Sequence, residues 1–114
     1  MNLQKVAALA CVMTALFATP STAEPTQSDW FSIASLAGGW VEGHLRVVSS
    51  GPFHNPSSCP YADGYVVDDS LPGAQLLQAM LITAYASGDQ VQVTVDGCAS
   101  GRPSEIGVQV RKST

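Results

Sequence analysis

The chain has few charged side chains and especially few basic ones. Of its 114 residues 12% are charged, with five Lys and Arg against nine Asp and Glu. Nucleic-acid-binding proteins neutralise phosphates with Lys and Arg, and anionic membrane surfaces attract the same residues. A chain of net charge −4 without a basic stripe therefore argues against both nucleic acid and an anionic membrane surface as partners.

Several catalytic and metal-binding motifs are also missing. There is no G-x-S-x-G nucleophile turn, and His44 and His54 are the only histidines. The calcium-loop order D-x-[DN]-x-[DN]-G is absent around Asp63, Asp68 and Asp69. We therefore expect a protein that is not an enzyme and that holds no metal and no cofactor.

The N-terminal residues 1–23 have the pattern of a secretory signal peptide. Lys5 supplies a positive charge, Val6 to Ala18 form an apolar run, and Ser21-Thr22-Ala23 place small residues at a cleavage site. The run is shorter than the roughly 20 apolar residues of a spanning helix. We expect a secreted or periplasmic protein without membrane insertion after cleavage, in which residues 24–114 form a single domain.

Cleavage changes both the cysteine count and the charge. It removes Cys11 and leaves Cys59 and Cys98, an even number in an oxidising compartment, which predicts a disulfide. It also removes Lys5, so the net charge falls from −4 to −5. Neutral ligands, glycans and protein partners remain compatible with this charge.

Alternating apolar and polar residues predict five strands in the mature chain. The first segment, with its aromatic and β-branched residues, also permits a short helix capped by Ser28. The strands are expected at Asp29–Leu36, Trp40–Val48, Asp63–Asp68, Gln90–Asp96 and Glu105–Arg111. Glu24–Ser28 is expected to be a frayed polar lead-in, and Ser49–Ala62 a long loop.

One segment, Pro72–Ser87, has helical rather than strand periodicity. Ser70 is the expected N-cap and Gly88 the expected C-terminal stop, with Asp68 and Asp69 near the N-terminus. The expected inward side chains on this helix are Leu76, Leu77, Met80 and Ala84, with Leu81 at the margin.

The element order β-β-β-α-β-β is that of the OB fold, a five-stranded Greek-key barrel. We therefore predict a mainly β, OB-fold-like barrel with one helix and one disulfide. The core is expected to contain Val41, Leu45, Val47, Leu77, Met80, Ala84, Val91, Val93, Val95, Ile106, Val108 and Val110.

The stretch Ala74–Val95, AQLLQAMLITAYASGDQVQVTV, resembles the helix-to-strand segment of bacterial exotoxin B subunits of the subtilase cytotoxin and pertussis-like group. It also resembles small secreted proteobacterial OB-fold proteins of unassigned activity that share an LL-x-A…A-x-SG-x-x-V-x-V-x-V-x-GC pattern. The toxin resemblance implies a secreted OB fold, pentameric rings and glycan binding. It transfers no individual sugar-binding residue to this chain.

Three aromatic residues in or beside loops are candidates for ligand contact. Trp40, Phe53 and Tyr61 could stack on a sugar or contact a peptide, and the alternative is that they plug the ends of the barrel as part of the core. The helix has no charged residue, and its expected outward side includes Gln78, Ile82 and Tyr85, which predicts a face for homo-oligomer formation. We expect a non-catalytic module that binds a glycan or protein, the alternative being a periplasmic accessory protein without a small ligand.

Overall fold

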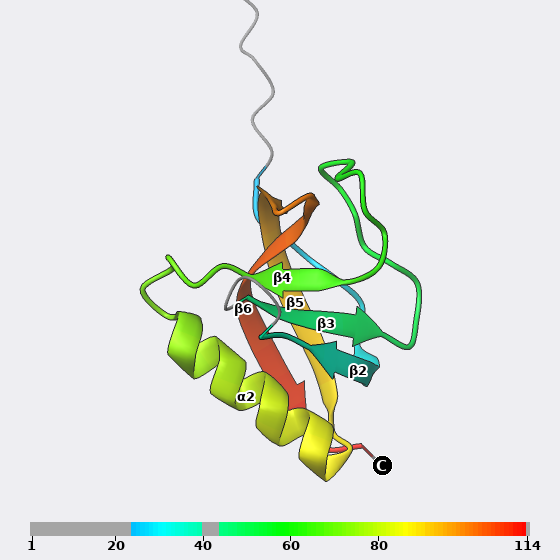
Figure 1. The fold of residues 1–114 in the computed structure, drawn as a ribbon. Coiled ribbons are helices and arrows are strands. Elements are labelled where there is room, and N and C mark those ends of the chain that lie inside the picture. The colour runs from blue at the N-terminus through cyan, green and yellow to red at the C-terminus, as the bar shows by residue number, and fades with distance from the viewer. Residues whose placement is uncertain (1–23, 40–43, 114) are drawn as a thin grey trace, which may run out of the picture.

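The computed structural model describes residues 24–39 and 44–113, which form a mainly β structure with one helix (Figure 1). In chain order the elements are β1 (Thr26–Gln27), β2 (Phe31–Ala37), β3 (Leu45–Ser49), β4 (Tyr65–Val67), α2 (Ala74–Ser87), β5 (Gln90–Ala99) and β6 (Arg102–Arg111). This confirms the prediction of a mainly β chain with one helix. The helix lies between β4 and β5, which correspond to the third and fourth predicted strands. The segment that could have been a short helix, residues 29–36, forms most of strand β2.

The strand pairings close into a ring. β2 pairs antiparallel with β3, and β3 with β4. β4 then pairs parallel with β6, β6 antiparallel with β5, and β5 returns to β2. We call β2, β3, β4, β6 and β5 the five-strand ring. Because each of these strands has a partner on both sides, none leaves a fully unpaired edge.

The polar lead-in is not frayed, which corrects the expectation for residues 24–28. Thr26 and Gln27 form β1, which pairs with Val95 and Thr94 of β5. Ser28 is buried, and its backbone N–H donates to the Val93 carbonyl while its hydroxyl accepts from the Val93 N–H. These bonds fix the lead-in because they satisfy backbone groups on both segments.

Helix α2 begins and faces the core differently from the prediction. Its N-cap is Gly73 without a side-chain cap, whereas Ser70 donates its N–H to the Asp68 carboxylate in the preceding turn. Gly88 ends the helix with φ 70°, the left-handed conformation expected there. The buried residues are Ala74, Leu77, Leu81 and Ala84. Leu76 is 68% exposed and Met80 only half-buried, so the predicted inward face was wrong for both.

The core expectation holds for β5 and fails in part for β6. Val91, Val93 and Val95 are fully buried, and so is Val47 of β3. Leu45 is half-buried against this core, while Val41 lies outside the described residues. In β6 the expected inward residues Ile106 and Val110 are exposed, Val108 is half-buried, and Glu105 is fully buried.

A β-bulge explains the altered face of β6. Gly107 pairs with Thr94, but Val95 pairs with Glu105, so Ile106 is the extra residue. An inserted residue reverses which side chains point inward on one side of the bulge. Simple alternation through Glu105–Arg111 therefore places the wrong residue in the core.

Candidate functional site

A group of polar side chains gathers where the loop before β4 meets β3 and the β5–β6 turn. At its centre the Asp63 carboxylate accepts hydrogen bonds from Nε and Nη2 of Arg102, the second at 3.0 Å. Arg46 Nη1 donates to the Asp63 backbone carbonyl at 2.7 Å and lies 3.4 Å from Oδ2. We call Arg46, Tyr61, Asp63 and Arg102 the Asp63 cluster.

Gly64 allows Asp63 to approach β3 this closely. Its φ is +142°, and a Cβ there would lie 2.8 Å from the Val47 carbonyl oxygen and 2.9 Å from Arg46 Cγ. The hydrogen bond from Arg102, with help from the charges of Arg102 and Arg46, lowers the pKa of Asp63 below its ordinary value. Asp63 is therefore ionised at neutral pH and holds both guanidinium groups in place.

The Tyr61 ring is exposed and yet held by its surroundings. Its backbone N–H donates to the Gly101 carbonyl at 2.9 Å, and the Arg102 guanidinium carbon lies 5.1 Å from the ring centroid. Gly101 has φ +79°, and a Cβ there would overlap the Tyr61 ring. The ring therefore packs on this glycine backbone, while 56% of the residue remains exposed.

Two more polar side chains, those of Ser100 in the β5–β6 turn and of His44 before β3, lie beside the cluster. Ser100 and Gly101 both have positive φ, as a two-residue type I′ hairpin turn requires. The Ser100 hydroxyl lies 3.3 Å from His44 Nδ1, and His44 Nε2 lies 3.7 Å from Asp68 Oδ1. The residue just before β3 is thus linked both to the turn and to the segment after β4.

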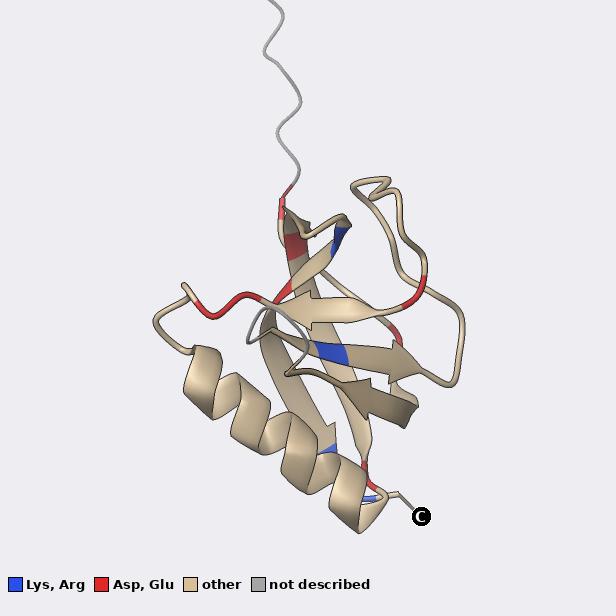
Figure 2. Cartoon of the chain, in the orientation of Figure 1, with Lys and Arg blue, Asp and Glu red and all other residues tan. Residues whose placement is uncertain are grey.

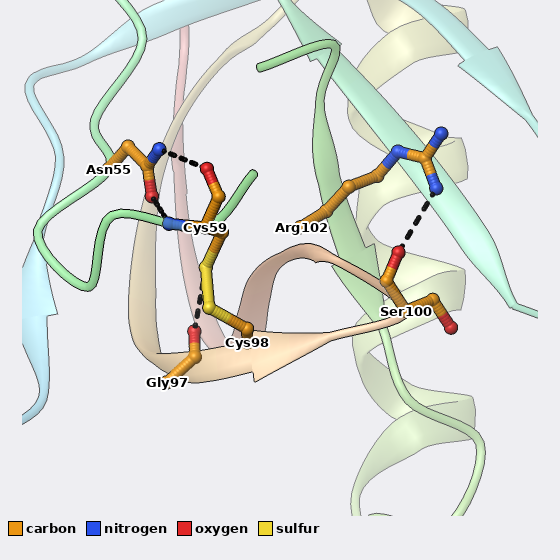
Figure 3. Close-up of a disulfide and its surroundings, with 6 residues drawn as sticks. All are labelled: Asn55, Cys59, Gly97, Cys98, Ser100 and Arg102. Atoms are coloured by element: carbon orange, nitrogen blue, oxygen red, sulfur yellow. Dashed lines mark hydrogen bonds between the residues drawn. A yellow bond between two sulfur atoms is a disulfide. The ribbon is translucent and has the colours of Figure 1, made fainter. Parts of the chain in front are cut away.

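The predicted disulfide is confirmed and aligns the two segments that build the cluster. Cys59 and Cys98 are bonded with their Cα atoms 5.8 Å apart (Figure 3). The Asn55 side chain brackets Cys59, accepting from its N–H and donating to its carbonyl, both at 2.9 Å. Figure 3 also shows Arg102 donating to the Ser100 carbonyl. Cys98 lies in β5, which continues to Ala99, beyond its predicted end at Asp96.

Two of the three predicted aromatic residues are described, and they have different surroundings. Tyr61 belongs to the Asp63 cluster. Phe53 is half-buried and packs against the core, with its ring centroid 5.0 Å from that of Tyr65. Trp40 lies outside the described residues. Phe53 therefore packs against the core, as the alternative of a barrel plug predicts, whereas Tyr61 is exposed.

Sequence reasoning missed Asp63, Arg46 and Arg102 as a unit, although the sequence contains a signal for it. Asp63 follows Cys59 by four residues, and Arg102 follows Cys98 by four. The disulfide indicates that the two segments come close, and the opposite charges in them are compatible with an ion pair. Which residues meet depends on the turn at Ser100–Gly101 between Cys98 and Arg102, which the cysteine spacing does not show.

The predicted oligomer face lies mostly exposed along α2. Ile82 is 52% and Tyr85 46% exposed, while Gln78 is half-buried and donates to the Asp69 carboxylate at 2.8 Å. Figure 2 shows no acidic or basic residue on this helix. Between α2 and β6 lie two shallow, mainly apolar hollows of about 320 Å³ each, which share Met80 in their lining.

The Asp63 cluster presents an aromatic ring, two guanidinium groups and a carboxylate, and the Ser100 hydroxyl lies in the adjoining turn. Within residues 24–39 and 44–113, no group of three His, Cys, Asp or Glu residues is placed to hold a metal ion, and no helix is long and apolar enough to cross a membrane. The chain matches no protein-family model, no curated protein and no solved structure.

Proposed function

We propose that the chain is a non-catalytic binding module that acts outside the cytoplasm and that its ligand is a glycan. The observation that carries this proposal is the Tyr61 ring, which is exposed but fixed by Gly101 and Arg102. A rigid aromatic face stacks on the apolar face of a sugar at a small cost in conformational entropy. Asp63 and the two arginines supply acceptors and donors for the sugar hydroxyls around it.

The position of the cluster in the fold supports this proposal. We infer that the five-strand ring is an OB fold, because the helix follows the third ring strand and the third and last strands close the ring in parallel. OB folds bind ligands on the face of strands two and three, between the loops that follow strands one and four. In this chain these parts include β3, β4 and the turn at Ser100–Gly101. The Asp63 cluster lies beside them, with Arg46 on β3, Tyr61 and Asp63 in the loop that leads into β4, and Arg102 directly after the turn.

The energetics of the cluster also favour a role in recognition. An exposed ion pair stabilises a fold by about 1 kcal/mol or less. Fold stability therefore gives little reason to hold two arginines, one aspartate and an exposed tyrosine in register on the surface. Because Asp63 neutralises one of the two guanidinium groups, the cluster suits a hydroxyl-rich ligand better than a polyanion.

The extracytoplasmic location rests on residues 1–23 and on the disulfide. The disulfide is compatible with an oxidising compartment. We further propose that the charge-free face of α2, with Ile82 and Tyr85, is covered by other copies of the chain, as in the B subunits that Ala74–Val95 resembles.

A glycan array probed with the oxidised protein tests the proposed function. The glycan with the strongest signal is then titrated calorimetrically against wild type, Tyr61→Ala and the matched control Tyr85→Ala. Tyr61→Ala removes the proposed stacking ring and should weaken binding by at least tenfold. Tyr85→Ala removes a ring on α2 and should change the affinity by less than twofold. Failure to bind any glycan, or equal affinity of Tyr61→Ala and wild type, would instead support an accessory protein without a small ligand.

A further inference from the structure

Glu105 is a carboxylic acid sealed inside the five-strand ring. None of its surface is exposed, and neither carboxylate oxygen has a hydrogen-bond partner within residues 24–39 and 44–113. The bulge opposite Val95 turns it inward, with the buried residues Pro103 and Ser104 immediately before it. An ionised carboxylate without a partner is very costly in such a place, so the closed ring contains the protonated acid.

Among the residues that the structure describes, the groups around Glu105 offer it no compensating positive charge. Tyr65 of β4 is a buried titratable neighbour, and its hydroxyl accepts the His54 backbone N–H at 2.7 Å. The neighbouring elements β2 and α2 contain no Asp, Glu, Lys, Arg or His, and the phenol of Tyr85 on α2 is exposed. The remaining charged residues on the ring strands are exposed or half-exposed: Arg46 on β3, Asp96 on β5, and Arg102 and Arg111 on β6.

Glu105 also lies beside the shortest pairing of the ring. β4 and β6 register at the pair Val66–Ser104, next to Glu105, whereas β5 and β6 pair along most of their length. The ion pair between Asp63, two residues before β4, and Arg102 of β6 spans the same seam. Opening the seam would therefore also separate the two halves of the Asp63 cluster.

We propose that Glu105 is a proton-controlled latch on the ring, which holds the β4–β6 seam closed while its carboxyl is protonated and opens the seam when it ionises. The proposal depends on the burial of Glu105 and on the strand pairing. Only its consequence for glycan binding, through the Asp63 cluster, rests on the proposed function. Opening hydrates the carboxylate and gives Ser104 and Val66 access to solvent. We place the opening here because β4 and β6 share the single register pair Val66–Ser104, next to Glu105. The disulfide between Cys59 and Cys98 joins the segment before β4 to β5 and keeps the opening local.

The direction of the pH dependence follows from the same burial. Desolvation raises the pKa of Glu105 from 4.5 to about 8. The Glu105 carboxyl therefore favours the closed ring fully below pH 4.5, where it is protonated in both states. This preference is lost as the pH rises to about 8, the pKa in the closed ring. Between these limits the ratio of closed to open rings should fall by about tenfold per pH unit. The latch therefore closes in mild acid and loosens in alkali.

Hydrogen exchange measured by mass spectrometry tests the latch in the oxidised protein expressed from the full chain. Exchange rates are divided by the chemical exchange rate at each pH from 5 to 9. We expect protection of 65–67 and 102–105 to fall as the pH rises, while 90–94 stays protected for longer. Glu105→Gln should abolish this difference, and the exposed-site control Asp96→Asn should keep it. A wild-type seam whose protection is independent of pH would overturn the proposal.

A second measurement needs no variant, in case Glu105→Gln fails to fold. The chain contains three glutamates, Glu24, Glu42 and Glu105, so carboxyl carbons labelled in glutamate give few NMR signals. We expect one signal to titrate above pH 7, in step with the loss of seam protection. Titration of every glutamate near pH 4 to 5 would overturn the latch, whether or not the protein binds a glycan.

Discussion

Removal of the disulfide should destabilise the domain by several kcal/mol. Cys59 and Cys98 are 39 residues apart, and closing a loop of that length restricts the unfolded chain by about 4 kcal/mol at 25 °C in the chain-entropy model. Small domains have a total free energy of unfolding of about 5–15 kcal/mol. The double variant Cys59→Ser/Cys98→Ser should therefore be close to unfolding.

The effect is measured by urea unfolding followed by circular dichroism. We expect the variant to lose about 2–5 kcal/mol, and wild type with a reducing agent to match it. The reducing agent should leave the variant unchanged, which controls for effects other than the bond. A loss below about 1 kcal/mol, or two reactive thiols in denatured, unreduced wild type, would refute the reasoning.

Three further predictions concern the core, the buried acid and self-association. The free energy of unfolding of wild type should fall as the pH rises from 4.5 towards about 8, by on the order of several kcal/mol in all, because unfolding lets Glu105 ionise. Urea titrations across this range should show that Glu105→Gln lacks this slope, and an unchanged slope would contradict the assignment. Val93→Asp places a charge at a fully buried position and should prevent folding, so a thermal melt like that of wild type would disprove the β5 register. Light scattering should give a mass well above one chain, and Ile82→Glu should lower it without changing the circular dichroism spectrum. A wild-type monomer at high micromolar concentration would contradict the proposed α2 interface.

The strands were predictable wherever one face of the sheet is buried and the other is not. Gln90–Asp96 alternates without interruption, and its three valines are all buried as expected. In β6 the same rule fails at Glu105, because a bulge cannot be recognised from alternation alone. The polarity of Glu105 also opposed its burial, since an unpaired buried acid is unfavourable in most folds.

The face of α2 was harder to predict because the helix lacks charged residues. Leucines and alanines occur on more than one side of the helix, so two neighbouring apolar stripes could have faced the core. The predicted stripe contains Leu76, Leu77, Met80 and Ala84, and the buried one contains Ala74, Leu77, Leu81 and Ala84. Leu77 and Ala84 belong to both stripes and were predicted correctly. Leu76 belongs to one of them and is exposed.

The candidate site depended on contacts between residues far apart in the sequence. Tyr61 was recognisable as an aromatic residue in a loop, but Asp63 and Arg102 are 39 positions apart and belong to no motif. Only the paired cysteines indicated that these two segments meet. Long-range ion pairs of this kind require the fold before they can be seen.

The most direct test of the proposed binding site is chemical-shift mapping on the isotope-labelled, oxidised protein. The titrant is the glycan with the strongest array signal. We predict that the largest backbone amide shifts lie in residues 61–64 and 99–102, around Tyr61 and Arg102, with little change along α2. Shifts confined to α2 and β6, or no shifts at a saturating glycan concentration, would contradict the proposal that the Asp63 cluster binds glycans.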